Sequence, residues 1–356
     1  MHEYRDTVTG FTVRRYTAGP ERNAKLYFTS ENFSVDDRYF FFNKQQLPNR
    51  SDGGTYRCEW ATGKIDRVTD ASYSGFALDR FRNVAFVCKN GTEVYEVDLD
   101  TKEMTLRGHL PKGGQVTGHL TASDTGRIAC SYHLANKIYA LVVLDPGKTE
   151  ADIVYESDFR LGHAQICPTD ENLIFYIHET EGDAFQRTWM CDVKEHYVRP
   201  YYVEHPSEWI THEVWSADGC EMALMKLDPA GPVDGEKGEK HTGKIIIGDK
   251  DGRHFDVEAC SDQILHPCFS RDRKWLCADR ISYLGVKMQE GVVLFNRESG
   301  KQLLIATTGY CKTGADHLHP SFNRKGDMIY FSNPDVEGTA QVCTIDLKQV
   351  MPYFES

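Results

Sequence analysis

Trp215-Ser-Ala-Asp218, followed by the apolar run Met222-Ala-Leu-Met225, is one unit of a repeat that decides the fold. Six other places along the chain show a similar short turn before an apolar run. These turns are Phe33-Ser-Val-Asp36, Phe76-Ala-Leu-Asp79, Thr121-Ala-Ser-Asp124, Cys167-Pro-Thr-Asp170, Phe269-Ser-Arg-Asp272 and Phe322-Asn-Arg-Lys325. Successive turns start 43, 45, 46, 48, 54 and 53 residues apart, which is close to the length of one four-stranded propeller blade.

A second signal lies between these turns, where an alternating strand runs into a polar turn and then into another strand. Examples are 56–68, 93–101 and 292–300. Such segments are typical of the outer hairpin of a blade. No segment keeps a 3.6-residue apolar period, so we predict an all-β fold, a seven-bladed β-propeller.

The two ends of the chain predict how the ring closes. Residues 8–15 match only the last turn and strand of a repeat, and the final repeat lacks that strand after Asp346. We therefore expect residues 11–16 to pair there as the outermost strand of blade seven, which would remove an exposed edge. Residues 1–356 are predicted to form a single propeller domain. A Gly-, Pro- and charge-rich insertion at 228–243 is predicted to be a mobile loop.

The amino-acid composition excludes some kinds of binding partner. The 356 residues include 41 Lys plus Arg against 53 Asp plus Glu, a formal charge of -12 that disfavours nucleic acid as a partner. Eleven cysteines without a C-x-x-C spacing predict reduced core thiols. No stretch has the ~18 apolar residues of a membrane span, and the N-terminus shows no secretory signal. We expect a cytoplasmic protein without a membrane partner.

Histidines recur in phase with the blades. His212, His266 and His319 each lie three residues before the aromatic residue of a turn, and His163 enters the preceding blade at a similar level. Equivalent positions in successive blades ring the propeller axis at one height, so these imidazoles are expected to converge. His317 precedes His319 by two residues, and strand alternation would place both on one face.

This pattern allows two interpretations. Repeated histidines can satisfy backbone groups in a structural ring, or they can bind a metal. An H-x-H pair with a third histidine is a plausible three-ligand site for a divalent transition metal, and the ligand set does not choose between Mn, Zn and Fe. His163 and His178 are interpreted as substrate contacts, the alternative being hydrogen-bonded residues of the channel.

An ordered series of motifs resembles the oligogalacturonate lyase family over most of the chain. The motifs are 6–10, 14–17, 162–170, Ile177-His178-Glu179, Gln186-Arg187-Thr-Trp189, 206–219, His266-Pro267 and 317–322. The resemblance implies a seven-bladed propeller of the cytoplasm that cleaves short unsaturated galacturonides by β-elimination with a manganese-type ion. It implies that His212 is the catalytic base, that Arg187 is the catalytic arginine, and that His266, His317 and His319 bind the metal.

One position departs from the family pattern. The family has a glutamine ligand three residues before the first histidine of the H-x-H pair, and this chain has Gly314 there. The fourth ligand would then be Asp316 or a water, or the site would have no fourth ligand. This departure favours, as an alternative, a lyase for another uronate-containing oligosaccharide. A non-catalytic propeller scaffold and a propeller hydrolase are further alternatives, although hydrolase sites favour carboxylate-rich calcium ligation.

Overall fold

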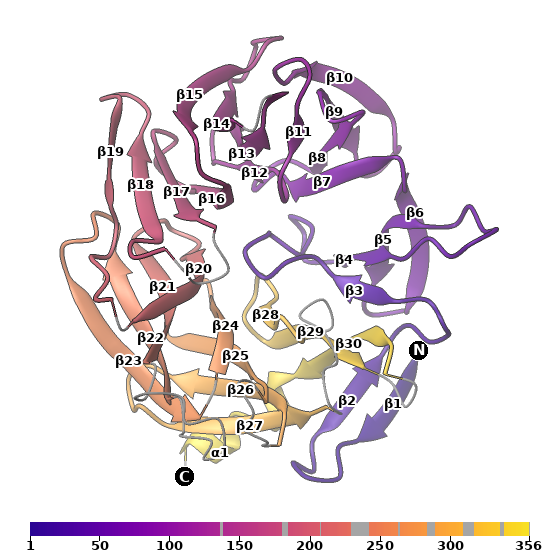
Figure 1. Ribbon diagram of the computed structural model, residues 1–356. Helices are drawn as coiled ribbons and strands as arrows, with labels where there is room; N and C mark the ends of the chain where they lie inside the picture. Colours follow the sequence, from indigo (N-terminus) through magenta and orange to yellow (C-terminus); the bar gives the residue numbers. More distant parts are fainter. Residues whose placement is uncertain are drawn as a thin grey trace. The chain divides into compact units, whose positions relative to one another are not determined.

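The computed structural model describes residues 1–135, 138–179, 184–206, 208–228, 242–262, 264–282, 289–308, 317–334 and 338–355. Strands dominate, and the short helices η3 (Leu347–Gln349) and α1 (Pro352–Glu355) lie near the C-terminus. The strands form seven antiparallel sheets, one for each repeat (Figure 1). The all-β class and the seven-bladed β-propeller predicted from the repeat are therefore confirmed.

The first four sheets follow one another along the chain. The first sheet contains β3 (Asn23–Lys25), β4 (Tyr39–Lys44), β5 (Gly54–Glu59) and β6 (Lys64–Asp70). The second contains β7 (Tyr73–Leu78), β8 (Val84–Lys89), β9 (Glu93–Asp98) and β10 (Met104–His109). The third contains β11 (Gln115–Val116), β12 (Thr121–Ala122), β13 (Ile128–His133), β14 (Tyr139–Leu144) and β15 (Asp152–Ser157). The fourth contains β16 (Leu161–Ile166), β17 (Leu173–His178), β18 (Thr188–Asp192) and β19 (Tyr197–Pro200).

The remaining three sheets come from the second half of the chain and from the N-terminus. The fifth contains β20 (Trp209–Trp215), β21 (Glu221–Asp228), β22 (Thr242–Asp249) and β23 (Phe255–Asp262). The sixth contains β24 (Ile264–Phe269), β25 (Trp275–Arg280), β26 (Gly291–Asn296) and β27 (Gln302–Thr307). The seventh contains β1 (His2–Arg5), β2 (Thr12–Arg15), β28 (Ser321–Phe322), β29 (Met328–Pro334) and β30 (Ala340–Asp346).

The seventh sheet joins the two ends of the chain in the order β1-β2-β30-β29-β28 (Figure 1). Val13 of β2 lies opposite Ile345 of β30, as the missing last strand of the final repeat predicts. The prediction was wrong in one respect, because β2 is not the outermost strand. The polar, largely exposed β1 folds back on β2 and pairs with it along its free edge.

The turn at the start of each repeat is closed by a recurrent backbone hydrogen bond. The amide of Ser216 donates to the carbonyl of Glu221 at 2.7 Å, and Ser270 donates in the same way to Trp275 at 2.9 Å. The corresponding donors in the other repeats are Ser34, Asp79, Ser123, Cys167 and Asn323. In three of these turns the serine hydroxyl also donates to the aspartate two residues later, from Ser34 to Asp36, from Ser216 to Asp218 and from Ser270 to Asp272. Ser, Asp or Asn occupies this point in six repeats and Cys167 in the seventh, so the backbone hydrogen bond is what all seven turns share.

The described residues fall into two compact units, residues 67–206 and residues 1–66 with 207–356. Each unit buries the facing sides of its own sheets. In 67–206, Leu141 of β14 and Ile174 of β17 belong to one apolar cluster. In the other unit, a cluster includes Ile245, Ile264 and Ile345 from three sheets. Packing of neighbouring sheets is thus the main source of the core, as in other layered β proteins.

Other predictions about the chain have mixed outcomes. Most described cysteines are buried thiols, as expected, whereas Cys220 is exposed. Strand β21 ends at Asp228 and β22 begins at Thr242, and the rest of the predicted 228–243 loop lies outside the described residues. No helix in the described part of the chain has the length and apolar character needed to cross a bilayer.

Asp6 ties the N-terminal hairpin to the sixth sheet, so we expect Asp6→Ala to lower the free energy of unfolding by about 2–4 kcal/mol. Its carboxylate accepts hydrogen bonds from the amides of Val8 and Thr9 and from the amide and hydroxyl of Thr307. Burial opposes ionisation, but hydrogen bonds from Thr9 and Thr307 outweigh it and hold the pKa of Asp6 below its ordinary value. Urea unfolding at several pH values measures the loss.

The pH dependence gives this prediction a second test. A carboxyl group whose pKa is lowered by folding stabilises the folded state above its unfolded pKa, and that contribution disappears as the pH falls through the folded pKa. The difference between wild type and Asp6→Ala should therefore be full at pH 7 and shrink below about pH 4. Asp98→Ala is the matched control, because the Asp98 carboxylate accepts hydrogen bonds from its own turn. An equal loss in both variants would show that the link to Thr307 contributes nothing.

Candidate functional site

Four of the phased histidines share an unusual backbone conformation. His163, His212, His266 and His319 have φ angles of 49°, 55°, 45° and 46°, in the left-handed region that non-glycine residues seldom occupy. In β16, β20 and β24 the pairing register shifts at the histidine, which marks a β-bulge. The same shift in β7 has Gly75 at this place, with φ 68°. A bulge redirects one side chain away from the regular alternation of the strand.

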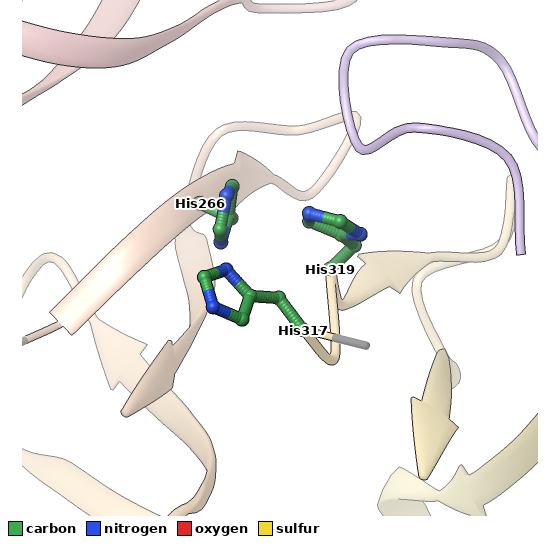
Figure 2. Close-up of side chains that lie close together, drawn as sticks. All are labelled: His266, His317 and His319. Carbon is green, nitrogen blue, oxygen red and sulfur yellow. The ribbon is translucent and has the colours of Figure 1, made fainter. Parts of the chain in front are cut away.

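His266, His317 and His319 form a cluster that could hold a metal ion. One ring nitrogen from each residue lies within 4.8 Å of the other two. Figure 2 shows the three imidazole rings turned toward a common space. His266 and His319 are buried and His317 is partly exposed. Three imidazoles suit a borderline divalent ion and leave further coordination positions for other ligands, so the donor set fits a metal centre.

His317 lies in a different kind of segment from the strand that we expected. We predicted that strand alternation would place His317 and His319 on one face. Strand β28 begins only at Ser321, so both histidines lie in the irregular segment that leads into it. His319 also has a left-handed backbone, with φ 46°, so the alternation of a regular strand does not apply to this pair. Gly314 and Asp316, which bear on a fourth ligand, lie outside the described residues.

The surroundings of His319 favour a neutral ring that can bind metal. Burial, together with positive charge at His266 and Lys25, holds the pKa of His319 well below its ordinary value. Asp279 of β25 is fully buried, and its carboxylate oxygens lie 2.9 and 3.0 Å from Nδ1 of His266. Burial raises the pKa of Asp279 to about 6, although positive charge at His317 opposes this. A neutral imidazole has a lone pair available for a metal ion.

His212 lies beside the cluster without belonging to its three-nitrogen set. Its ring centroid is 4.0 Å from that of His266. The buried ring of Phe28 packs against both, with centroids 6.2 Å from His212 and 5.0 Å from His266. Tyr27 contacts His319 with ring centroids 5.1 Å apart. Tyr27 and Phe28 thus form an aromatic wall beside the histidines.

The other predicted site residues gather around Glu179 in the unit 67–206. Nη2 of Arg187 lies 4.0 Å from one carboxylate oxygen of Glu179, and Nε2 of His163 lies 3.9 Å from the other. Arg187 is buried, and its backbone amide donates to Glu204 at 2.7 Å. The ring of His178 packs against Phe159 at a tilt of 32°, with ring centroids 3.9 Å apart. Burial and the charge of Arg187 lower the pKa of His178.

Sequence reasoning missed several residues of these two groups. Asp279 interrupts the apolar strand β25, and a buried acid in such a strand would have been a usable signal. His119 precedes the turn residue Ser123 by four positions, as His163 precedes Cys167. Burial, together with positive charge at His163, lowers the pKa of His119 to about 4. Tyr27 and Phe28 follow β3 without any local pattern that distinguishes them from core residues.

Comparisons with known proteins agree with this description. The oligogalacturonate lyase of Dickeya dadantii is 23% identical over 95% of this chain and 94% of its own length. The oligogalacturonide lyase of Pectobacterium atrosepticum is 22% identical with the same coverage. A solved oligogalacturonate lyase in complex with manganese superposes with a TM-score of 0.84 at 19% identity, covering 97% of this chain and 95% of that one. The oligogalacturonate lyase of Vibrio parahaemolyticus also gives a TM-score of 0.84, at 18% identity over 97% of this chain and 96% of that chain. No family model matches the chain.

Proposed function

We propose that this chain, which belongs to the oligogalacturonate lyase family by its full-length relatives, cleaves short unsaturated galacturonides by β-elimination with one divalent metal ion. The observation that carries the proposal is the convergence of His266, His317 and His319, with the His212 ring beside them. We propose Mn²⁺ as the ion, because a solved relative is a manganese complex. Zn²⁺ and Fe²⁺ remain alternatives for an all-imidazole set.

The chemistry explains why such a site suits a uronate. The proton on C5 is weakly acidic, because its removal puts negative charge next to a carboxylate that is already anionic. A divalent ion held by His266, His317 and His319 would supply Lewis acidity that neutralises this carboxylate. The residues of the chain must then remove the proton, hold the sugar and keep the developing charge in place.

His212 is assigned the role of general base. Its ring is next to His266 and outside the three-nitrogen set, so this assignment does not use it as a metal ligand. An unperturbed imidazole, with a pKa of ~6.5, is largely neutral at cytoplasmic pH and matches this task. His212 takes the C5 proton, the C4–O bond breaks, and the electron pair forms the C4–C5 double bond of the unsaturated product. The protonated His212 then returns the proton to the departing sugar oxygen, so the step consumes no proton and adds no water.

Arg187 is assigned to the substrate carboxylate. A buried guanidinium makes charge-assisted hydrogen bonds that strengthen as negative charge develops on the enediolate. Glu204 supports this assignment, because it accepts hydrogen bonds from the amides of Arg187 and Thr188 and so fixes the backbone that carries the guanidinium. His163 and His178 are assigned to substrate binding. The proposed partner is therefore a small acidic oligosaccharide, handled by one domain spanning 1–356 in the cytoplasm.

The direct test mixes the protein with unsaturated digalacturonate and MnCl₂ and follows the ultraviolet absorbance of the conjugated product. We expect product formation that stops when EDTA is added and resumes with excess Mn²⁺. A panel of other uronate-containing oligosaccharides runs in parallel. Activity confined to another uronide would replace the galacturonide assignment with the rival lyase. Binding of the galacturonide without any product, at every metal tried, would favour the non-catalytic scaffold and defeat the proposal.

A further inference from the structure

A single carboxylate connects two of the clustered histidines. Asp279 Oδ1 and Oδ2 lie 2.9 and 3.0 Å from Nδ1 of His266, and Oδ2 also accepts the backbone amide of His319 at 3.1 Å. The Asp279 side chain is wholly buried. The contact links the sixth sheet, which supplies Asp279 and His266, to the segment before β28, which supplies His319.

The chemistry of these groups determines where the protons lie. The His319 amide can only donate, so the oxygen facing it must accept. An ionised carboxylate offers acceptors alone, and Nδ1 of His266 must then carry a proton and donate it. This leaves Nε2 of His266 without a proton, in the tautomer that binds a metal.

We propose that Asp279 is the positioning residue of the metal centre. It fixes the tautomer and ring orientation of His266, and through the His319 amide it also holds the left-handed turn that aims the His319 ring. One buried acid thereby sets two ligands, one on β24 of the sixth sheet and one in the segment before β28. The inference rests on the proposed metal centre but not on the lyase reaction, because tautomer and metal affinity can be measured without substrate.

Asp279→Asn separates this role from simple packing, since the side chain keeps its size. An amide has one acceptor oxygen and one donor nitrogen, but it would face two donors. If its oxygen accepts the His319 amide, its NH₂ group faces Nδ1 of His266. The ring must then accept at Nδ1 and carry its proton on Nε2, where a metal ion would bind. We expect the dissociation constant for Mn²⁺ to rise about 10–100-fold, the usual effect of losing an outer partner of a metal ligand.

The matched control is Asp37→Asn. Asp37 is also buried and also accepts backbone amides. Its donors are the amides of Arg324 and Lys325 and the side chain of Asn323, around the turn after β28, and not the histidines of the cluster. Any general effect of an Asp-to-Asn change on a buried acceptor should appear in both variants. The shift in Mn²⁺ affinity should appear in Asp279→Asn alone.

Two measurements test the proposal on the intact chain after chelator treatment. Isothermal titration with MnCl₂ gives the affinities of wild type and both variants, with circular dichroism to check folding. Nitrogen-15 NMR of the metal-free proteins gives the tautomer of His266, which should be protonated on Nδ1 in wild type and on Nε2 in Asp279→Asn.

The wild-type NMR result tests the proposal even if Asp279→Asn does not fold. A wild-type His266 protonated on Nε2 would overturn it, as would equal Mn²⁺ affinity in wild type and Asp279→Asn, equal losses in both variants, or no Mn²⁺ binding by wild type. A protein that binds Mn²⁺ with the expected dependence on Asp279 but cleaves no galacturonide would sustain this inference while defeating the proposed function.

Discussion

His212→Ala is expected to lower kcat for unsaturated digalacturonate about 10²–10⁴-fold, the usual scale for losing a positioned proton-transfer group. The imidazole of His212 lies beside His266 but outside the three-nitrogen cluster. Its removal should therefore leave the metal-binding nitrogens in place. Steady-state kinetics and elemental analysis of the same preparation measure the rate and the metal content together.

His212→Gly is the matched control for the backbone. His212 has a φ of 55°, which glycine adopts without the steric cost that alanine retains. Both variants lack the base, so both should show the same low rate, while the glycine variant should be the more stable of the two. A variant that forms unsaturated product at close to the wild-type rate would refute the assignment. The base would then be sought at His163 or His178.

The double substitution His317→Ala/His319→Ala is expected to abolish metal binding and activity together. Two of the three clustered imidazoles disappear, and the remaining His266 cannot hold an ion alone. The loss of affinity should exceed about 100-fold, because even an outer partner of a ligand is worth 10–100-fold. Elemental analysis and titration with MnCl₂ measure binding, and the absorbance assay measures activity.

His196→Ala/His254→Ala is the control for removing two imidazoles from the chain. Both residues are exposed, and neither belongs to the cluster. This variant should keep wild-type metal content and rate. Wild-type metal content in His317→Ala/His319→Ala would mean that the ion binds elsewhere, and the metal assignment would fail even if the lyase reaction were confirmed.

The repeat was predictable because its signal is chemical as well as periodic. Ser216 and Ser270 close their turns with backbone amides and also bond Asp218 and Asp272, so the sequence pattern and the turn geometry have one cause. Strand β1 was not predicted. His2–Arg5 is short and mostly exposed, and its sequence shows no apolar alternation. It forms a strand because it pairs with β2, and that pairing cannot be seen in its own sequence.

The clustered histidines of the candidate site could be predicted from the sequence, but the residues that pack against them or bond to them could not. Phase along the repeat was enough to select His212, His266 and His319, because equivalent positions recur in equivalent sheets. Asp279 and Phe28 come close to the histidines only in the folded chain. Neither lies at a regular spacing from these histidines in the sequence, so the repeat could not reveal them. The left-handed β-bulges could not be predicted either. A left-handed backbone favours glycine, so a histidine in the sequence gives no sign of one.

These left-handed histidines have a consequence for engineering a more heat-resistant variant. Each one holds a backbone conformation that costs on the order of 1 kcal/mol for a residue with a side chain, and Gly75 shows that the same bulge accepts glycine in β7. A design procedure guided by backbone strain alone would therefore select glycine at His163, His212, His266 and His319. The resulting protein would have lost the imidazoles on which its proposed chemistry depends, and Asp279 would have lost its bond to His266, so these four positions should be held constant in any such design.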